Sequence, residues 1–309
     1  MRKKRIIHHF LSLLIKRSRA LLLPLGVVLL LLLTSSRTDG GGMRVRSWTA
    51  MGNSFTLHSV TDFWWGLWGM AATHRDSDYV HVLHRLITEQ QQYEPELGIA
   101  NIVQFEYSHA SQTVRASTVN NLRGDEQLVV LRIGECAGSL ATYTTDLERL
   151  VDSLRERAPE AVVVITGTFW PHYERNACQR AAALSRHCVW VPLDVLYGND
   201  THSSLDTQVM GDDGEWHLIK DGGSVAKSVA LHANNLGHRR IAQAIFDSLQ
   251  AFYARPNGVE SLRADSWEVV RTEYFDLHGR ALPGRPAKGL CIRRVTYRDG
   301  RWESFKEVR

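Results

Sequence analysis

Short apolar runs alternate along the chain with segments whose apolar residues recur every three or four positions. The runs at 128–133 and 161–165 are almost wholly apolar, which is typical of parallel strands covered on both faces. A third run, 189–195, contains Pro192 and therefore predicts an edge strand or the end of a strand. A short strand is also expected at 45–49.

Helices are predicted between these runs. Leu147, Leu150, Val151 and Leu154 follow the spacing of one helix face, and Thr145 with Glu148 would form a capping box at its start. The other predicted helices lie around 79–87, 176–184 and 241–252. Alternating strands and helices predict a parallel sheet with helices on both faces, a three-layer α/β/α sandwich.

The pattern changes after Pro256. Strands are expected at 267–271, 289–297 and 301–305, and Asp299-Gly300 is a hairpin turn signal. The chain is therefore divided into an N-terminal segment (1–42), an α/β domain (43–256) and a small C-terminal β module (257–309).

The first 19 residues carry seven Lys or Arg and no acid, and the apolar run 20–33 follows them. This order, with small residues at 34–36, is typical of a secretory signal. The run is shorter than the ~20 residues of a usual membrane span, so we expect a cleaved signal peptide, with an uncleaved anchor as the alternative. Both predict a secreted or cell-envelope protein, with membrane contact only through this segment if it is uncleaved.

Beyond residue 19 the charges nearly balance. Of 37 basic residues 30 remain, against 33 acidic ones. Because this part of the chain is nearly neutral, its charge gives no electrostatic reason to expect a nucleic-acid ligand.

All four cysteines lie beyond the signal. Cys178 and Cys188 are close enough in sequence to bridge a helix end and the next strand, but free thiols fit equally well.

In sheets of this kind ligands bind beyond the carboxyl ends of the strands. Gly52-Asn53-Ser54 follows the first expected strand. Such a turn can present the Ser54 hydroxyl as a nucleophile and the Ser54 N–H to an oxyanion, although these are also ordinary turn residues. Gly134-Glu135-Cys136 directly follows the strand that ends at Ile133.

Trp64, Trp65 and Trp68 are interleaved with glycines. Glycine allows close backbone approach to a ligand, so the tryptophans are candidates for substrate binding. An aromatic cluster packed beneath a loop is the alternative.

His232 and His238 lie at the start of the last predicted helix. A loop histidine is the usual base for activating a serine.

Taken in this order, the segments resemble the sequence blocks of the SGNH (GDSL-like) hydrolase superfamily over about 43–249. Gly52-Asn53-Ser54 resembles the first block, with Asn in place of the usual Asp. The segment 68–73, Trp-Gly-Met-Ala-Ala-Thr, resembles the second block. Gly134-Glu135-Cys136 stands where the family has Gly-x-Asn, and the His232 segment resembles the last block. The tryptophan stretch is similar to one found in secreted bacterial proteins, including Bacteroidetes-like ones.

The resemblance implies a flavodoxin-like sandwich and an acyl-enzyme mechanism. Ser54 would be the nucleophile and His232 its base, and the N–H groups of Ser54 and Gly69 would bind the oxyanion, with Cys136 as a weak third donor. It implies no metal and no organic cofactor, and the sequence contains no motif for either. The family's acid corresponds to Val229.

Two carboxylates in the preceding loop are candidates for the missing acid. Asp213 or Asp221 would substitute for it, or the enzyme would work with a Ser–His dyad. We expect His238 to be structural.

The C-terminal module contains Tyr-Phe-Asp-Leu-His-Gly-Arg at 274–280, Lys-Gly-Leu-Cys-Ile at 288–292 and a basic end. With these segments it resembles C-terminal regions of secreted Bacteroidetes proteins, some of which are sorting domains for type IX secretion. A plain accessory β module is the alternative.

Together these features predict a secreted serine esterase or acyl hydrolase that acts on a small-molecule or glycan ester. The alternative is a non-catalytic binding protein of the cell envelope built on the same fold.

Overall fold

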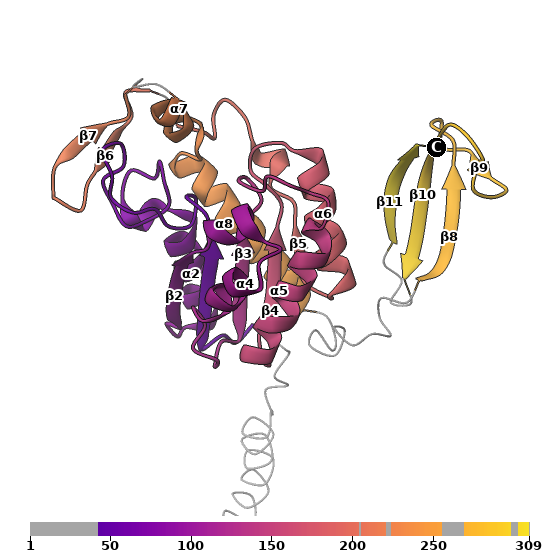
Figure 1. Cartoon of the computed structure of the whole chain (residues 1–309), viewed down its shortest axis with the longest axis horizontal. Coiled ribbons are helices and arrows are strands. Elements are labelled where there is room, and N and C mark those ends of the chain that lie inside the picture. Colours follow the sequence, from indigo (N-terminus) through magenta and orange to yellow (C-terminus); the bar gives the residue numbers. More distant parts are fainter. Residues whose placement is uncertain (1–42, 204, 221–223, 255–268, 298–301, 309) are drawn as a thin grey trace, which may run out of the picture. The chain divides into compact units, whose positions relative to one another are not determined.

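The computed structural model describes residues 43–203, 205–220, 224–254, 269–297 and 302–308 (Figure 1). The described residues form an α/β part up to residue 254 and a β module from residue 269 on, and each is described by itself. The predicted signal at 1–42, Asp221 and the Asp299-Gly300 turn lie outside the described residues.

Five parallel strands form the main sheet. Their order is β2-β1-β3-β4-β5. The strands are β1 Ser47–Gly52, β2 Glu96–Asn101, β3 Leu128–Arg132, β4 Val162–Thr166 and β5 Val189–Val191. Every residue of β1, β3 and β4 is buried, which explains why β3 and β4 appear in the sequence as continuous apolar runs.

Side chains of the central strands alternate between two cores. On β3, Val130 belongs to one core, whereas Val129 and Leu131 belong to the other. The first core is completed by α2 Tyr79–Gln91 and α8 Asn235–Tyr253. The second is completed by four helices: α3 Val103–Ser108, α4 Gln112–Val119, α5 Tyr143–Arg157 and α6 Tyr173–Ser185. The predicted three-layer α/β/α sandwich is therefore confirmed.

Some element predictions need correction. Helix α5 begins two residues before Thr145, and its N-cap Thr142 makes no side-chain capping bond, so the capping box predicted at Thr145 is wrong. Strand β2 was missed because only one of its residues is buried, as at a sheet edge. The prediction drawn from Pro192 is confirmed, since β5 is an edge strand that ends at Val191.

A third, smaller core lies under the tryptophan segment. Trp64 and Trp68 pack there with Val209 and Ile219. Near it the chain forms the short helix η1 Arg75–Ser77, the hairpin of β6 Gln208–Met210 and β7 Trp216–Leu218, and α7 Ser224–Leu231. A second short helix, η2 Asp194–Leu196, packs against the first core through Leu196. The hairpin and α7 lie together at one end of the α/β part (Figure 1).

The β module is a four-stranded antiparallel sheet with strand order β11-β10-β8-β9. Its strands are β8 Val269–Phe275, β9 Ala281–Leu282, β10 Leu290–Tyr297 and β11 Trp302–Val308. The change to strands and turns predicted for the end of the chain is confirmed.

All four cysteines are free thiols, so Cys178 and Cys188 are not bridged in this structure. Among the described residues, no helix combines the length and the apolar character needed to cross a membrane.

Candidate active site

The structure brings Ser54 and His232 together across 178 residues of sequence. Ser54 follows the end of β1, and His232 directly follows α7. The Ser54 Oγ lies 2.8 Å from His232 Nε2, within the range of a nucleophile–base hydrogen bond.

The other ring nitrogen of His232 sets its tautomer. His232 Nδ1 lies 2.6 Å from the Ser228 carbonyl oxygen, which can only accept a hydrogen bond, so Nδ1 carries the proton. Nε2 is then left without a proton and can accept the Ser54 hydroxyl. A backbone carbonyl thus occupies the position where a catalytic triad has its acid.

The His232 ring is held between two aromatic side chains. Phe55 lies against it at 4.4 Å between ring centroids, and Trp170 meets it edge-on at 5.1 Å. The Trp170 indole N–H also donates to the Leu231 carbonyl at 2.8 Å. Burial lowers the pKa of His232 to about 3, so the imidazole is a neutral base at ordinary pH.

The residues after His232 hold its loop in place. Asn234 caps α8 by accepting from Gly237 N–H and donates from its amide to two backbone carbonyls, and Asn235 bonds the backbone and hydroxyl of Thr73. Gly237 is required because a Cβ there would lie 2.1 Å from the Thr201 carbonyl oxygen.

His238 is structural, as expected. It accepts from Tyr79 N–H at Nδ1 and donates from Nε2 to the Met70 carbonyl, and it is completely buried.

The two predicted backbone oxyanion donors differ in whether their N–H groups already have a hydrogen-bond acceptor. Among the described residues the Ser54 N–H has no hydrogen-bond acceptor. The Gly69 N–H, by contrast, donates to the buried Asp78 carboxylate at 3.0 Å, so in this arrangement it is occupied. The neighbouring Met70 N–H donates to the Ser54 carbonyl. This packing requires glycine at 69, since a Cβ there would lie 2.3 Å from the Phe55 carbonyl oxygen.

Cys136 is held through its backbone. Its N–H donates to Glu106 Oε2 at 2.7 Å. Burial and the Glu106 charge raise the pKa of the thiol to about 11, so it stays protonated at neutral pH and is a poor nucleophile.

The prediction that the tryptophans bind substrate needs a correction. Trp64 is fully buried and Trp68 is 2% exposed, and the Trp68 indole N–H donates to the Ala72 carbonyl. Both rings pack in the third core, and Trp68 also lines a small pocket. Trp65 is half-buried and stacks on His217 at 4.6 Å. The aromatic cluster beneath a loop is what the structure contains.

Asp213 is not the missing acid. Its carboxylate lies 2.9 Å from His217 Nε2, and the His232 Nδ1 that it would serve is bonded to Ser228 instead.

Beneath Ser54 lies a buried polar network that the sequence pattern does not predict. The Asn53 amide donates to Glu106 at 2.9 Å and to Glu135 at 2.8 Å. Glu135 is also held by both terminal nitrogens of Arg132. The Arg132 guanidinium lies 3.8 Å from the centroid of the Phe55 ring, the ring that packs against His232.

No sequence signal marked Glu106. It lies in the short helix α3, outside every block that the resemblance assigned.

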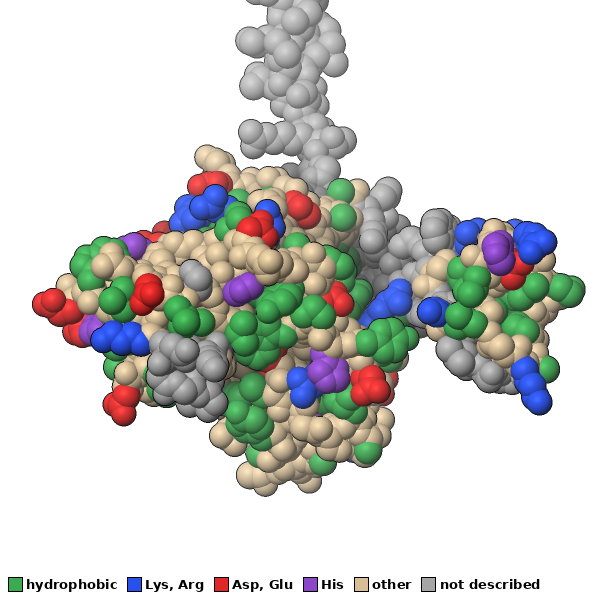
Figure 2. Space-filling view, turned by 90° about the horizontal axis from the view of Figure 1, so that it is seen from above, with side chains coloured by type: hydrophobic (Ala, Val, Ile, Leu, Met, Phe, Trp, Pro, Cys, Tyr) green, Lys and Arg blue, Asp and Glu red, His purple; other side chains and the backbone are tan. Residues whose placement is uncertain are grey.

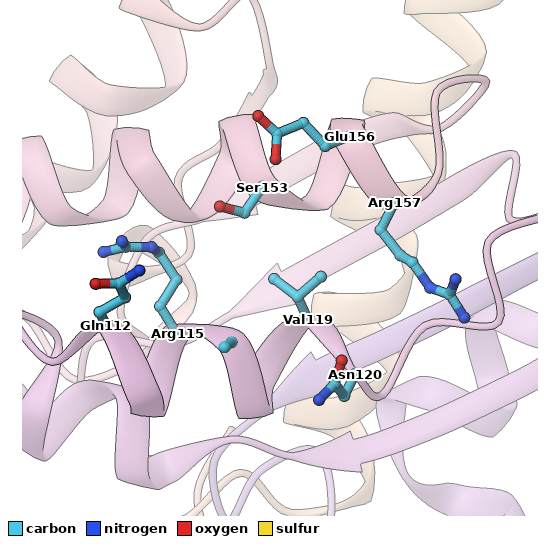
Figure 3. A pocket seen from close by; sticks show the side chains of 8 residues that line it. Gln112, Arg115, Val119, Asn120, Ser153, Glu156 and Arg157 are labelled. Carbon is cyan, nitrogen blue, oxygen red and sulfur yellow. The ribbon is translucent and has the colours of Figure 1, made fainter.

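Two pockets are found in the α/β part. One of about 210 Å³ is lined by Trp68, the segment 74–76 and the segment 210–212. The other, of about 380 Å³, lies between α4 and α5, where Arg115 and Arg157 flank it (Figure 3). Neither is lined by Ser54 or His232.

Basic and acidic side chains are interspersed on the face of the α/β part seen in Figure 2, and no large area has one sign. Within the described residues no three His, Cys, Asp or Glu side chains are grouped so as to hold a metal ion.

No protein-family model and no curated protein matches the sequence. The fold has counterparts among solved structures. A protein from Bacteroides ovatus described as a GDSL-like lipase has 12% identity and a TM-score of 0.44, covering 68% of this chain and 100% of its own. The family 3 carbohydrate esterase of Clostridium thermocellum has 16% identity and a TM-score of 0.41, covering 65% and 93%.

A salicylyl-acyltransferase, SsfX3, from a tetracycline biosynthetic pathway has 16% identity and a TM-score of 0.42, covering 69% of this chain. The match spans 57% of the acyltransferase's own length. The TM-scores of these three structures do not exceed 0.44.

Proposed function

We propose that this protein is a serine ester or acyl hydrolase that works through an acyl-enzyme on Ser54. The observation that carries the proposal is the 2.8 Å contact between Ser54 Oγ and an unprotonated His232 Nε2. The pair, in which His232 is buried and Ser54 is partly exposed, lies at the carboxyl end of a parallel sheet, where such folds bind ligands.

The proposed reaction has two halves. Ser54 Oγ attacks the ester carbonyl while His232 Nε2 takes the hydroxyl proton, and the resulting imidazolium then gives that proton to the departing alcohol. In the second half, water attacks the acyl-enzyme, His232 accepts a proton from the water, and the acid leaves as Ser54 regains its proton. The Ser54 N–H is the proposed oxyanion donor.

The Ser228 carbonyl fixes the tautomer of His232 but carries no full negative charge. It therefore stabilises the imidazolium less than a carboxylate would. Low turnover relative to a complete triad is expected, with Gly69 N–H as a second donor only if the oxyanion displaces Asp78.

Labelling by a fluorophosphonate probe tests the proposal directly, because the probe reacts only with an activated serine. Wild-type protein should be labelled, whereas Ser54→Ala and His232→Ala should not. Ser59→Ala and His278→Ala, at exposed positions, are the matched controls and should be labelled normally. Labelling that persists in Ser54→Ala would move the site elsewhere, and a folded wild-type protein that is never labelled would favour the non-catalytic binding protein.

A glycan ester is the proposed substrate class. Support comes from the pocket of about 210 Å³, whose Arg75 and Asp212 side chains offer polar groups to sugar hydroxyls. Trp216, 53% exposed, lies edge-on to His74 of that pocket. Trp216→Ala should raise KM for an acetylated oligosaccharide and leave the kinetics of p-nitrophenyl acetate unchanged. An equal effect on both substrates would remove the glycan proposal.

We also propose export, on the strength of the charged N-terminal start and the apolar run at 20–33. Fractionation of native cells should place the protein outside the cytoplasm. Sorting through the C-terminal module is testable by deleting 257–309, which should then leave the protein inside the cell.

A further inference from the structure

Glu106 bridges two loops beneath the candidate nucleophile. Its Oε1 accepts from the Asn53 amide at 2.9 Å, and Asn53 is the residue next to Ser54. Its Oε2 accepts from the backbone N–H groups of Gly134 and Cys136 at 2.8 and 2.7 Å. The side chain is fully buried. One carboxylate therefore fixes both the loop after β1 and the loop after β3.

We propose that Glu106 is a positioning residue for Ser54, and that its ionised carboxylate is the form that holds the nucleophile loop in place. This inference rests on the proposed hydrolase function. Glu106 does not touch Ser54, and it acts through Asn53.

The donor pattern explains why the ionised form matters. All three groups that contact Glu106 are N–H donors. A carboxylate accepts all of them, whereas a protonated acid carries an O–H donor for which no acceptor is found among these partners. Protonation therefore leaves a buried O–H without an acceptor among these partners and weakens the hydrogen bonds that the carboxylate accepts.

Asn53 cannot adapt by turning its amide over. Its Oδ1 already accepts from Phe55 N–H at 3.2 Å and from Arg132 at 3.3 Å, and its Nδ2 also serves Glu135. Each orientation other than the observed one would place two acceptors or two donors in contact.

The charges around Glu106 make its protonation accessible. Glu135, which is paired with Arg132, acts on it electrostatically, and Glu106 in turn acts on Cys136, on Tyr107 of α3 and on Tyr143 of α5. Burial, followed by the Glu135 charge, raises the pKa of Glu106 to about 7. Burial lowers the pKa of His232 to about 3, so His232 does not titrate in the same range. The acid limb of activity is thus assigned to Glu106.

Glu126 offers a matched control at the opposite end of the sheet. It is also fully buried and also accepts from two backbone N–H groups and one side chain, those of Arg123, Gly124 and Thr49. Glu126→Gln removes a carboxylate that accepts from as many donors as Glu106 does. None of the donors to Glu126 is next to Ser54 in the sequence.

The test is the pH dependence of kcat for p-nitrophenyl acetate and of the fluorophosphonate labelling rate between pH 5.5 and 8.5. Wild type and Glu126→Gln should gain about tenfold between pH 6 and pH 8 with a midpoint near 7. Glu106→Gln should have a maximal rate about ten- to a hundredfold lower and no limb in this range. Glu106→Asp, which keeps the charge, should retain a limb and serves if the Gln variant does not fold.

A limb of unchanged midpoint in folded Glu106→Gln would overturn the inference, because a group other than Glu106 would then be titrating. A wild-type rate that does not change across this range would overturn it as well. A folded wild type that is neither labelled nor active at any pH would overturn the hydrolase proposal itself. These outcomes are separate from one another.

Discussion

Each end of the central sheet has a buried glutamate with the same number of hydrogen-bond donors, but the pKa values of the two glutamates shift in opposite directions. At each end a fully buried glutamate accepts from two backbone N–H groups and one side chain, Glu106 at the carboxyl end and Glu126 at the amino end. Although burial acts to raise the pKa of Glu126, its hydrogen bonds hold that pKa below the ordinary value. The pKa of Glu106 is raised to about 7 by burial and by Glu135.

The number of hydrogen bonds does not explain this difference in pKa, which comes from the stronger effect of burial on Glu106 and from the neighbouring charge of Glu135. Glu135 is a second buried carboxylate that shares the Asn53 amide with Glu106, and like charges so close oppose ionisation. The carboxyl end thus stores electrostatic strain beside the candidate nucleophile, as functional sites commonly do. At the amino end, the hydrogen bonds of Glu126 stabilise its ionised form, and its role is structural.

The largest expected effect is the difference in kcat between variants of two serines, Ser54 after the end of β1 and Ser47 at its start. Ser54→Ala should lower kcat for p-nitrophenyl acetate by about 10⁴-fold or more, because it removes the nucleophile. Ser47→Ala, a buried serine at the other end of the strand, should leave kcat unchanged after correction for folded protein. Comparable losses in both variants would mean that the two ends do not differ in function.

Placing Asp at position 53, as in the first block that the sequence resembles, should be harmful here. Asn53→Asp would bring a third carboxylate against Glu106 and Glu135 and remove the amide that both accept from. A loss of about 3 kcal/mol or more in the free energy of unfolding is expected from urea titration at pH 8, with loss of probe labelling.

The matched change at the amino end is Thr49→Val, which removes the one side-chain donor to Glu126. It should lower the unfolding free energy by about 1 kcal/mol and leave labelling intact. Equal losses for the two variants would contradict the contrast between the ends.

The two glutamates should give stability changes of opposite sign with pH. Relative to Glu106→Gln, wild type should lose stability on the order of 3 kcal/mol as pH rises from about 4.5 through about 7, because a raised folded-state pKa favours the protonated folded form. Relative to Glu126→Gln, wild type should lose stability as pH falls, because the folded-state pKa is lowered. Urea unfolding of the three proteins across pH 4 to 8 measures both. The same sign for both pairs would refute the assignment.

The smallest expected effect concerns Cys136. If its side chain is directed at the oxyanion, an amide is a better donor than a thiol, so Cys136→Asn should raise kcat by about tenfold, or ~1.4 kcal/mol, with little change in KM. Lost activity would show that the thiol, or its fit beside Glu106, is needed.

Much of the layered fold could be predicted because its signals are local. The apolar runs that became β3 and β4 are continuous since both faces of each strand are buried. The helix face of Leu147, Leu150 and Leu154 is likewise visible within a few turns of sequence. Edge strand β2 gave no such signal, because it is only partly covered.

For the site, the sequence determined which residue types were available and in what order, and the resemblance pointed to Ser54 and His232. Only the tertiary structure decided what surrounds them. The acceptor for His232 is a backbone carbonyl, which no residue type reveals, and the Gly69 N–H is bonded to Asp78 through a contact formed by folding.

Glu106 shows the same limit most clearly. Its role depends on donors at Asn53, Gly134 and Cys136, which lie 28 to 53 residues away in the sequence. Hydrogen bonding and desolvation depend on what surrounds a group in space. A pattern along the chain can name a nucleophile, but the electrostatic setting in which it would work exists only once the strands are side by side.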